Sequence, residues 1–344
     1  RAHKPAVARG VDGTGFQSRP YGVVQMAAIA LKPGNGVRLK GGSTAVESTR
    51  VLFELSREAT ADHDASTDGW AQLVEARADV TAMLDMDESI DLLMPRGSSA
   101  FVEYVQDNTS IPVLGHTEGI CHIFVDHEAD LDMATEVAFD AKVQYPAVCN
   151  AVETLLVHES VAEAFLPQIT KRYAAADVAV RGDERTREIV DVAAASEADW
   201  ETEYGDLIVA VKVVDSLDDA INHITAHGSK HTESIISEDA DRAGRFMRSL
   251  DSASVFHNAS TRFSDGYRFG LGAEVGISTG KIHARGPVGL EGLTTYNYHL
   301  DGDAHPVATY TRHDPRPFTH QEFDGEWLPG ERSTAPAEST GTPR

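Results

Sequence analysis

Apolar runs that suit buried strands alternate along this chain with segments whose apolar residues recur at helical spacing. Regular alternation of strands and helices predicts a parallel sheet with helices on its faces, and therefore an α/β fold. Turns at the strand ends are where such folds bind ligands. The expected strands cover residues 37–39, 90–94, 121–125, 152–157, 207–213, 234–237 and 254–257.

The expected helices follow from caps and from apolar spacing. A helix capped by Ser43 or Thr44 should bury Val51, Leu52 and Leu55, and further helices are expected at 70–82, around Val102 and Val105, at 130–144, at 160–173 and from Leu217 to the stop at Gly228. The run 23–31 is the first core element, because residues 1–17 are polar and show no periodicity. Residues 313–344 are rich in Pro, Thr and Glu, which predicts a disordered tail.

Acidic residues dominate the charge: 30 basic against 54 acidic side chains give a formal charge of −24. This balance argues against nucleic-acid binding. Only 8 lysines stand beside 22 arginines, and the acids are spread along the chain, a pattern that suits a halophilic protein in high intracellular salt. An ordinary acidic protein is the alternative. No run is long and apolar enough to span a membrane, and two cysteines give no disulfide framework, so we expect the cytoplasm.

Cys149 is the candidate nucleophile. It lies between Pro146, which ends a helix, and the strand 152–157, so a loop could present its thiol to a substrate. The alternative is a small buried hydrophobic side chain, and this explains Cys121 within its strand. The histidines 116, 122 and 127 lack the spacing of a metal site, so we expect no metal.

Lys40 follows a strand and stands among glycines that do not form a common nucleotide-binding motif. Its ammonium group could meet a ribose or a phosphate there, although a solvated lysine is the commoner finding.

Taken together, six segments resemble the gamma-glutamyl phosphate reductase family, also called glutamate-5-semialdehyde dehydrogenases, within the aldehyde dehydrogenase superfamily. They are LKPGNGVRLKGGST (31–44), DLLMPRGSSAF (91–101), IPVLGHTEGICHIFVD (111–126), QYPAVCNAVETLLV (144–157), NASTRFSDG (258–266) and FGLGAEVGISTGKIHARGPVGLEGLTTY (269–296). The resemblance runs from about Arg19 to Tyr298, with the segments in the family's order.

The resemblance implies an aldehyde-dehydrogenase-like fold. A partial, N-terminally incomplete Rossmann-like NADP domain is expected at 1–118, and an α/β catalytic domain at 119–285. Residues 286–312 would form a return segment with an oligomerisation strand near 292–298, followed by the acidic tail 313–344. A homo-oligomer is implied.

The resemblance also assigns roles to individual residues. Cys149 matches the family's nucleophile. Lys40 stands where the superfamily contacts the adenosine ribose, and no acid follows it through Thr44, so NADPH is expected. Gly97 and Ser98 match the loop near the nicotinamide, and Glu203 matches the glutamate that holds the nicotinamide ribose.

The implied reaction is NADPH-dependent reduction of L-glutamate 5-phosphate to the 5-semialdehyde through a Cys149 thioester, in proline biosynthesis. Arg262 and Arg285 are the arginines expected to hold the substrate's anionic groups. His116 stands where hydrolytic aldehyde dehydrogenases keep a water-activating glutamate. A nonphosphorylating aldehyde dehydrogenase and an inactive paralogue that acts as a binding partner are the alternatives. The latter is suggested by SRPYGVV at 18–24, which departs from the family's SRPNVT and its oxyanion-binding asparagine.

Overall fold

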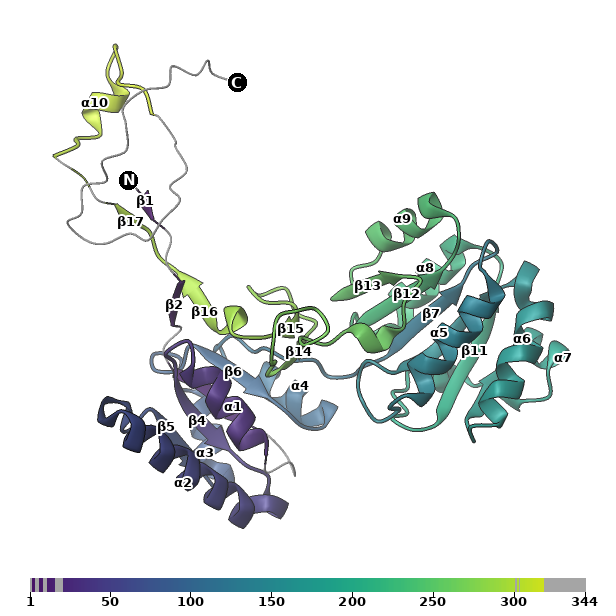
Figure 1. The fold of residues 1–344 in the computed structure, drawn as a ribbon, viewed down its shortest axis with the longest axis horizontal. Coiled ribbons are helices and arrows are strands. Elements are labelled where there is room, and N and C mark those ends of the chain that lie inside the picture. The colour runs from purple at the N-terminus through teal and green to yellow at the C-terminus, as the bar shows by residue number, and fades with distance from the viewer. Residues whose placement is uncertain are drawn as a thin grey trace. The chain divides into compact units, whose positions relative to one another are not determined.

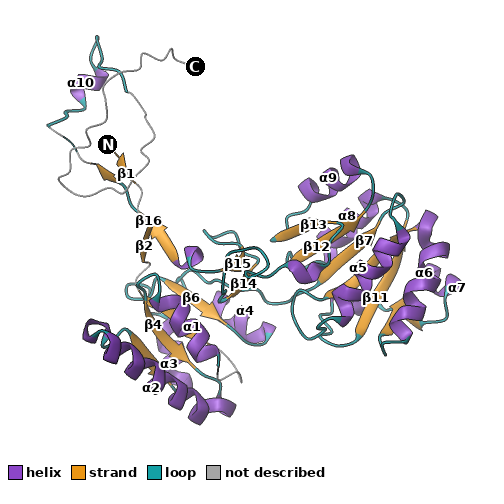
Figure 2. Ribbon diagram, viewed as in Figure 1, coloured by secondary structure: helices purple, strands orange, loops and turns teal. Residues whose placement is uncertain are grey.

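A computed structural model describes residues 21–300, 302 and 304–318, together with the strands β1 (Ala2–His3), β2 (Ala6–Ala8) and β3 (Val11–Gly15). The chain divides into two compact units, residues 8–294 and the combination of 1–7 with 295–344 (Figure 1). Helices alternate with strands through most of the larger unit (Figure 2). The chain therefore has the α/β organisation that its sequence predicts.

A seven-stranded parallel sheet holds the second half of the larger unit, in the order β10-β9-β11-β8-β7-β12-β13. Its strands are β7 (Cys121–Val125), β8 (Val152–His158), β9 (Ala179–Gly182), β10 (Ala193–Ala194), β11 (Ile208–Val214), β12 (Thr232–Ile236) and β13 (Ser254–His257). The five strands predicted from 121 onwards are confirmed, each within two residues at either end.

Helices cover both faces of this sheet. They are α5 (Leu131–Val143), α6 (Glu159–Ala174), α7 (Glu184–Ile189), α8 (Leu217–His227) and α9 (Ala240–Ser249). Asp130 caps α5 and Ser216 caps α8 through their side chains. Helix α9 was not predicted, because most of its residues are polar or charged.

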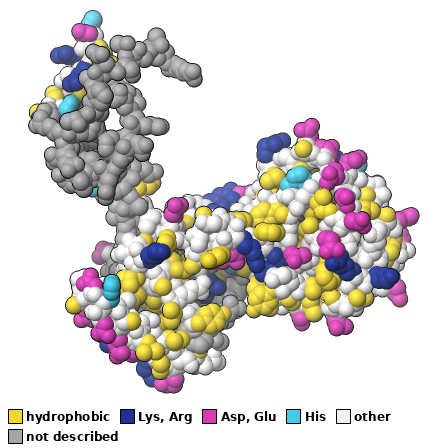
Figure 3. Space-filling view, viewed as in Figure 1, with side chains coloured by type: hydrophobic (Ala, Val, Ile, Leu, Met, Phe, Trp, Pro, Cys, Tyr) yellow, Lys and Arg dark blue, Asp and Glu magenta, His cyan; other side chains and the backbone are white. Residues whose placement is uncertain are grey.

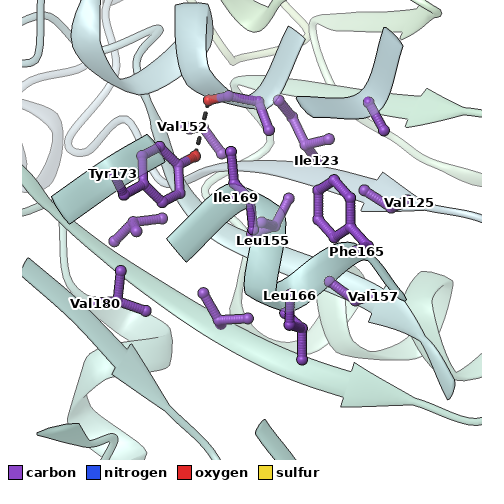
Figure 4. Close-up of a cluster of buried hydrophobic side chains, with 14 of the residues drawn as sticks. Ile123, Val125, Val152, Leu155, Val157, Phe165, Leu166, Ile169, Tyr173 and Val180 are labelled. Carbon is purple, nitrogen blue, oxygen red and sulfur yellow. Dashed lines mark hydrogen bonds between the residues drawn. The ribbon is translucent and has the colours of Figure 1, made fainter. Parts of the chain in front are cut away.

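The core of this sheet consists of two apolar layers. Helices α5 and α6 bury Phe165 and Ile169 against Leu155 on one face (Figure 4), and α8 and α9 bury Ile224 and Phe246 on the other. The Tyr173 hydroxyl donates a hydrogen bond to the Ala138 carbonyl at 2.8 Å, so the one polar atom of that side chain is satisfied inside the layer.

A second parallel sheet, in the order β5-β4-β3-β6, precedes it in the chain. Its other strands are β4 (Gly36–Lys40), β5 (Ala71–Val74) and β6 (Leu92–Pro95), and its helices are α1 (Gly22–Leu31), α2 (Val46–His63), α3 (Arg77–Leu84) and α4 (Ser99–Asp107). The apolar run 23–31 thus forms α1, which packs on Leu39 and Met94.

Three expectations for this region are wrong. The segment 70–82 is not one helix: Ala71 pairs with Val37 of β4, and this pairing outweighs the helical propensity of the segment. In α2 the buried residues are Thr49 and Phe53; of the three apolar residues expected there, Leu52 packs partly buried against the core, whereas Val51 and Leu55 are more than half exposed. Residues 11–15, which were expected to be part of an unstructured start, form β3 between β4 and β6. Two glycines and an aspartate interrupt the alternation of apolar residues that would have indicated a strand.

The remaining elements are short. The antiparallel pair β14 (Gly276–Ser278) and β15 (Gly286–Val288) packs Val275 and Val288 into the α1 cluster. The smaller unit contains the antiparallel pair β1 and β17 (His299–Leu300), together with α10 (Ala308–Thr311). Most of the predicted tail, residues 319–344, lies outside the described residues. The domain boundaries remain predictions. Among the described helices, none combines the length and hydrophobicity that a membrane span requires.

Candidate active site

The segments that precede three neighbouring strands converge at the amino edge of the seven-stranded sheet. His116 comes shortly before β7, Cys149 before β8 and His231 directly before β12, and these strands lie side by side in the order β8-β7-β12. Residues 116, 149 and 231 meet because parallel strands begin at the same edge. One ligand atom of each side chain lies within 4.8 Å of those of the other two.

A cavity of about 560 Å³ opens at this cluster. Arg96 and Gly97, which follow β6 of the other sheet, line it together with the first turn of α1 and the segment around β14. Charged side chains of both signs line it, namely Arg96, Arg262, Glu203, Asp265 and Glu274, in addition to His116 and Cys149. A site of this composition suits a small molecule that carries both negative and positive groups.

Cys149 is held by its backbone. A β-carbon added at Gly119 would lie 2.2 Å from the Cys149 carbonyl oxygen, so the nucleophile's loop packs directly against a residue that has no side chain. The Cys121 thiol donates a hydrogen bond to the same carbonyl at 3.2 Å. Cys121 is fully buried, as expected for a cysteine within a strand. The loop after Pro146 therefore presents Cys149 to the cavity from a fixed position.

Burial raises the pKa of the Cys149 thiol to about 12, and the nearby Glu203 carboxylate raises it further while Arg96 opposes the shift. The resting group is therefore a thiol near neutral pH, and its reaction needs a proton acceptor. His116 is neutral, because burial lowers its pKa. Its Nδ1 lies 2.8 Å from the Ile277 carbonyl oxygen; an oxygen of this kind only accepts, so Nδ1 carries the proton and Nε2 the lone pair.

Glu203 lies in the turn after the 3₁₀ helix η3 (Glu197–Glu201) and also lines the cavity. Its Oε2 accepts a hydrogen bond from the Gly119 N–H at 3.0 Å. Gly119 therefore links two predicted site residues, through a backbone contact with Cys149 and through a hydrogen bond to Glu203.

Arg262, in η4 (Thr261–Phe263), is buried with only 8% of its surface exposed, and it lines the same cavity. Its Nε donates to Gln144 Oε1 at 2.9 Å, which fixes the guanidinium, and burial lowers its pKa. A partly desolvated guanidinium of this kind is a strong site for a carboxylate or a phosphate.

Three of the lining charges, those of Arg96, Asp265 and Glu274, were not predicted from the sequence. Arg96 stands one residue after β6, at the strand end where ligands of such sheets are expected, and it hydrogen-bonds to the Val275 carbonyl. Its position directly after the strand 90–94 was the available signal. Glu274 accepts a hydrogen bond from the Gly266 N–H at 2.7 Å, and no sequence pattern marked it.

Comparison with known proteins gives a consistent result. The aldehyde dehydrogenase family model matches residues 21–200. A gamma-glutamyl phosphate reductase of Natronomonas pharaonis is 70% identical over 329 residues, which cover 95% of this chain and 74% of that protein, and one of Haloquadratum walsbyi is 66% identical over 94% of this chain and 72% of that protein. The chain belongs to the gamma-glutamyl phosphate reductase family. This membership confirms the resemblance drawn from the six sequence segments.

A solved gamma-glutamyl phosphate reductase, from Thermotoga maritima, has the same fold: its TM-score is 0.86 at 45% identity, over 89% of this chain and 74% of that one. An acetylating aldehyde dehydrogenase of Geobacillus thermoglucosidasius shares the fold at 16% identity, with a TM-score of 0.68 over 89% of this chain and 78% of that one. The aldehyde-dehydrogenase-like fold is therefore confirmed.

Within this gamma-glutamyl phosphate reductase fold, the structure brings together only part of the predicted site. Cys149, Gly97, Glu203 and Arg262 line one cavity, and Tyr21 and Gly22 of the departing SRPYG segment line it as well.

Three predicted site residues are not among the residues that line the cavity. Lys40 ends β4 and donates a hydrogen bond to the Gly41 carbonyl. Ser98 occupies the N-cap position of α4, directly after Gly97. Arg285 donates hydrogen bonds to Asp251, at 2.9 Å to Oδ1 and 2.8 Å to the carbonyl oxygen, and this exposed ion pair accounts for its position.

Proposed function

We propose that this chain reduces L-glutamate 5-phosphate to L-glutamate 5-semialdehyde and phosphate with NADPH, as a phosphorylating aldehyde dehydrogenase of proline biosynthesis. The observation that carries the proposal is the position of Cys149 in a cavity that also contains the two arginines Arg96 and Arg262. Gamma-glutamyl phosphate reductase is the name of two relatives that are 70% and 66% identical to this chain. The thiol provides the nucleophile, and the arginines provide partners for the substrate's anionic groups.

The acyl-transfer step uses Cys149 alone as the covalent group. The thiol releases its proton to solvent, its sulfur forms a bond to the acyl carbon of the substrate, and the bond from that carbon to the phosphate oxygen breaks. Phosphate leaves with the electron pair, and a thioester remains on Cys149. A thioester accepts hydride far more readily than the ionised carboxylate of free glutamate would.

Substrate recognition follows from the charges that line the cavity. The ligand carries a phosphate, an α-carboxylate and an α-ammonium group. Arg96 and Arg262 suit the two anions, and Glu274 or Asp265 suits the ammonium group. We assign Arg262 to the α-carboxylate, because its Nε is already committed to Gln144 and its terminal nitrogens face no carboxylate in the hydrogen bonds of the described residues.

The cofactor site is proposed at the carboxyl end of the four-stranded sheet. Gly97 and Ser98 follow β6, and Lys40 ends β4 of the same sheet. The Glu203 carboxylate gives one oxygen to Gly119 and keeps the other for a ribose hydroxyl. These groups fit a dinucleotide with a 2′-phosphate near Lys40. NADPH, when bound, supplies the hydride that converts the thioester into the aldehyde.

Oxyanion stabilisation rests on the backbone, because the family's asparagine is replaced in the SRPYG segment. Tyr21 and Gly22 line the cavity at this point. We assign the Cys149 N–H as one donor to the developing oxyanion; loss of a second donor typically costs about 3–4 kcal/mol of transition-state stabilisation.

Composition and exposed residues also support proposals about the salt environment, the compartment and the oligomeric state of the protein. Its lysine-poor, acidic composition is that of a halophilic protein, in line with the two relatives from halophilic archaea. Both cysteines are free, and we propose the cytoplasm as its compartment. We also propose a homo-oligomer that uses the segment 292–298, where Tyr296 and Tyr298 are exposed.

Phosphate dependence tests the function against its two alternatives. The experiment measures NADP⁺ reduction with glutamate 5-semialdehyde while inorganic phosphate is varied. The proposal predicts turnover that requires phosphate and saturates with it. Turnover without phosphate would indicate a nonphosphorylating dehydrogenase, and NADPH binding without turnover would indicate an inactive paralogue.

A further inference from the structure

The structure assigns a second ligand to the active-site cluster: we propose that His116, Cys149 and His231 bind a thiophilic divalent cation such as Zn²⁺, and that this cation blocks the nucleophile. The cluster consists of one potential thiolate and two imidazoles whose ligand atoms all lie within 4.8 Å of one another. Cysteine sulfur and histidine nitrogen are the ligands that Zn²⁺ prefers, usually in tetrahedral geometry.

His231 points most directly to a ligand. Its side chain is fully buried, and its Nε2 has no hydrogen-bond partner among the described residues. A buried polar atom without a partner typically costs about 1–3 kcal/mol, so its presence calls for an explanation. A metal ion would use the nitrogen lone pair that nothing else in this part of the chain uses.

The neighbours of His231 allow its ring lone pair to lie on Nε2. Its Nδ1 lies 2.9 Å from Thr232 Oγ1 and 3.5 Å from Cys121 Sγ. The Cys121 thiol donates its own proton to the Cys149 carbonyl, so the Cys121 sulfur is an acceptor toward His231. With the ring proton on Nδ1, which can donate to Thr232 Oγ1, Nε2 keeps a lone pair that is free to coordinate. Backbone and side-chain partners on the second nitrogen are typical of metal-binding histidines.

His116 has the same arrangement. Its Nδ1 donates to the Ile277 carbonyl oxygen at 2.8 Å, which leaves the Nε2 lone pair available. The His116 and His231 rings lie edge to face, with their centroids 4.9 Å apart. His116 thus already has the tautomer that a metal requires, and His231 has it when Nδ1 donates to Thr232 Oγ1.

The spacing admits an ion after a small adjustment. Three atoms 4.8 Å apart would each lie about 2.8 Å from their common centre, whereas Zn–N is about 2.0–2.1 Å and Zn–S about 2.3 Å. Each ligand atom would therefore move by roughly 0.5–0.8 Å, within the reach of side-chain rotation. A water molecule or a substrate oxygen would supply the fourth ligand from the cavity.

Binding exchanges a proton for the ion. The Cys149 sulfur forms a bond to the metal, its proton is released to solvent, and no oxidation occurs. The Glu203 carboxylate near Cys149 and His116 favours the added positive charge, and the Arg96 guanidinium opposes it. The thiolate that would attack the substrate is then occupied, so the bound cation inhibits the reaction. Mg²⁺ and Ca²⁺ prefer oxygen ligands and should not bind here.

The spacing of the histidines along the chain predicts no metal site, whereas the folded chain brings three potential ligands together. Ligand-spacing rules detect residues that are close along the chain, whereas positions 116, 149 and 231 belong to three separate segments. Only the adjacency of β8, β7 and β12 brings their preceding residues together.

Titration with Co²⁺, a spectroscopic substitute for Zn²⁺, tests the site without reference to activity. The full chain should bind one Co²⁺ with a thiolate-to-cobalt charge-transfer band and with d–d bands of tetrahedral intensity. Alkylation of Cys149 in the unmodified sequence should abolish the charge-transfer band. Zn²⁺ should compete for the site, whereas excess Mg²⁺ should not.

Variants separate this site from other buried histidines. His231→Asn should weaken Co²⁺ binding and Zn²⁺ inhibition at least tenfold. His223→Asn is the matched control, because His223 is also buried and its Nε2 also lacks a partner among the described residues, yet it lies outside the cluster.

Two results would overturn the proposal: a charge-transfer band that survives alkylation of Cys149, or equal weakening in the two histidine variants. If His231→Asn does not fold, His116→Gln replaces it with the same expectation. Because metal binding is read from absorption, its failure is distinct from a failure of the proposed reaction.

Discussion

Gly119 and Cys149 are packed backbone against backbone, so closely that a β-carbon on Gly119 would fall 2.2 Å from the Cys149 carbonyl oxygen and 2.6 Å from its Cα. Gly119→Ala must therefore displace the nucleophile's loop. Because a displacement of about 1 Å can cost about 100-fold in rate, we expect kcat to fall by roughly that factor. Steady-state kinetics with circular dichroism as a check of folding would measure it.

Gly280→Ala is the control for this prediction. The nearest atom to a β-carbon there is 3.7 Å away, so the methyl group fits without adjustment. Its kcat should remain within about twofold of the unmodified chain. A Gly119→Ala variant that is folded and equally active would show that the loop position does not matter for the reaction.

Glu203 controls the acidity of Cys149. The pKa of the thiol is raised to about 12 by burial first and by the Glu203 carboxylate second, so removal of that charge should lower it. Glu203→Gln should therefore shift the pH dependence of Cys149 alkylation by iodoacetamide to lower pH, and the rate at a fixed pH should rise. The same variant should weaken NADPH binding, because it loses the proposed ribose contact.

The alkylation rate of Glu203→Gln should rise while its affinity for NADPH falls, and a general loss of structure in the variant would not produce this combination. Glu238 follows the carboxyl end of β12 and does not line the cavity. Glu238→Gln removes the same charge there and should change neither the alkylation profile nor NADPH binding. An unshifted alkylation profile in Glu203→Gln would contradict the electrostatic role of Glu203.

The ion pair between Asp126 and Arg242 should stabilise the seven-stranded sheet. Asp126 is fully buried at the end of β7 and accepts hydrogen bonds from Arg242 at 2.6 and 2.7 Å and from Ser237 at 2.9 Å. Arg242→Ala would leave this carboxylate buried without its charged partner. We expect a loss of about 3 kcal/mol in the free energy of unfolding, measured by urea denaturation.

Arg245→Ala, in the same helix, is the matched control, because its pair with Asp218 is exposed and should be worth less than about 1 kcal/mol. The pH dependence has a definite sign. Burial raises the pKa of Asp126, but the bonds from Arg242 and Ser237 outweigh it and lower the pKa from 3.8 to about 2. The stabilisation should therefore be complete above pH 4 and be lost as the pH falls toward 2.

Salt should stabilise this protein. Acidic side chains are spread over the surface of the larger unit (Figure 3), and the formal charge is −24. The Debye length falls from about 10 Å at 0.1 M to about 3 Å at 1 M, so molar KCl should relieve the repulsion and raise the midpoint of thermal unfolding. Affinity for NADPH, corrected for the folded fraction, should decline over the same range because its phosphates meet cationic groups. A midpoint that is flat or falls with KCl would contradict the halophilic interpretation.

Much of the fold could be predicted from the sequence, because strands such as 121–125 and 152–157 are continuous apolar runs that are bounded by turn or helix-capping residues. The errors fell where long-range pairing decides the structure. Ala71–Val74 has the composition of a helix but completes the edge of the four-stranded sheet, and Val11–Gly15 has almost no strand signal of its own.

The candidate site was predictable only where a local sequence signal or the family resemblance marked its residues. Cys149 stands on a loop that Pro146 marks, and family resemblance supplied Glu203, Gly97 and Arg262. The convergence of residues 116, 149 and 231 depends on the order of the strands, which local patterns do not contain. Arg285 matches a family segment, yet in the folded chain it is paired with Asp251.

The central claim is that Cys149 forms a thioester that phosphate, not water, resolves. The most direct measurement is a rapid-mixing experiment in which the protein meets NADP⁺ and glutamate 5-semialdehyde without phosphate, followed by mass spectrometry of the Cys149 peptide. We predict a burst of one NADPH per active site, a glutamyl adduct on Cys149, and steady turnover only after phosphate is added. Continued turnover without phosphate, or a burst that persists in Cys149→Ser but not in Cys121→Ser, would contradict the account.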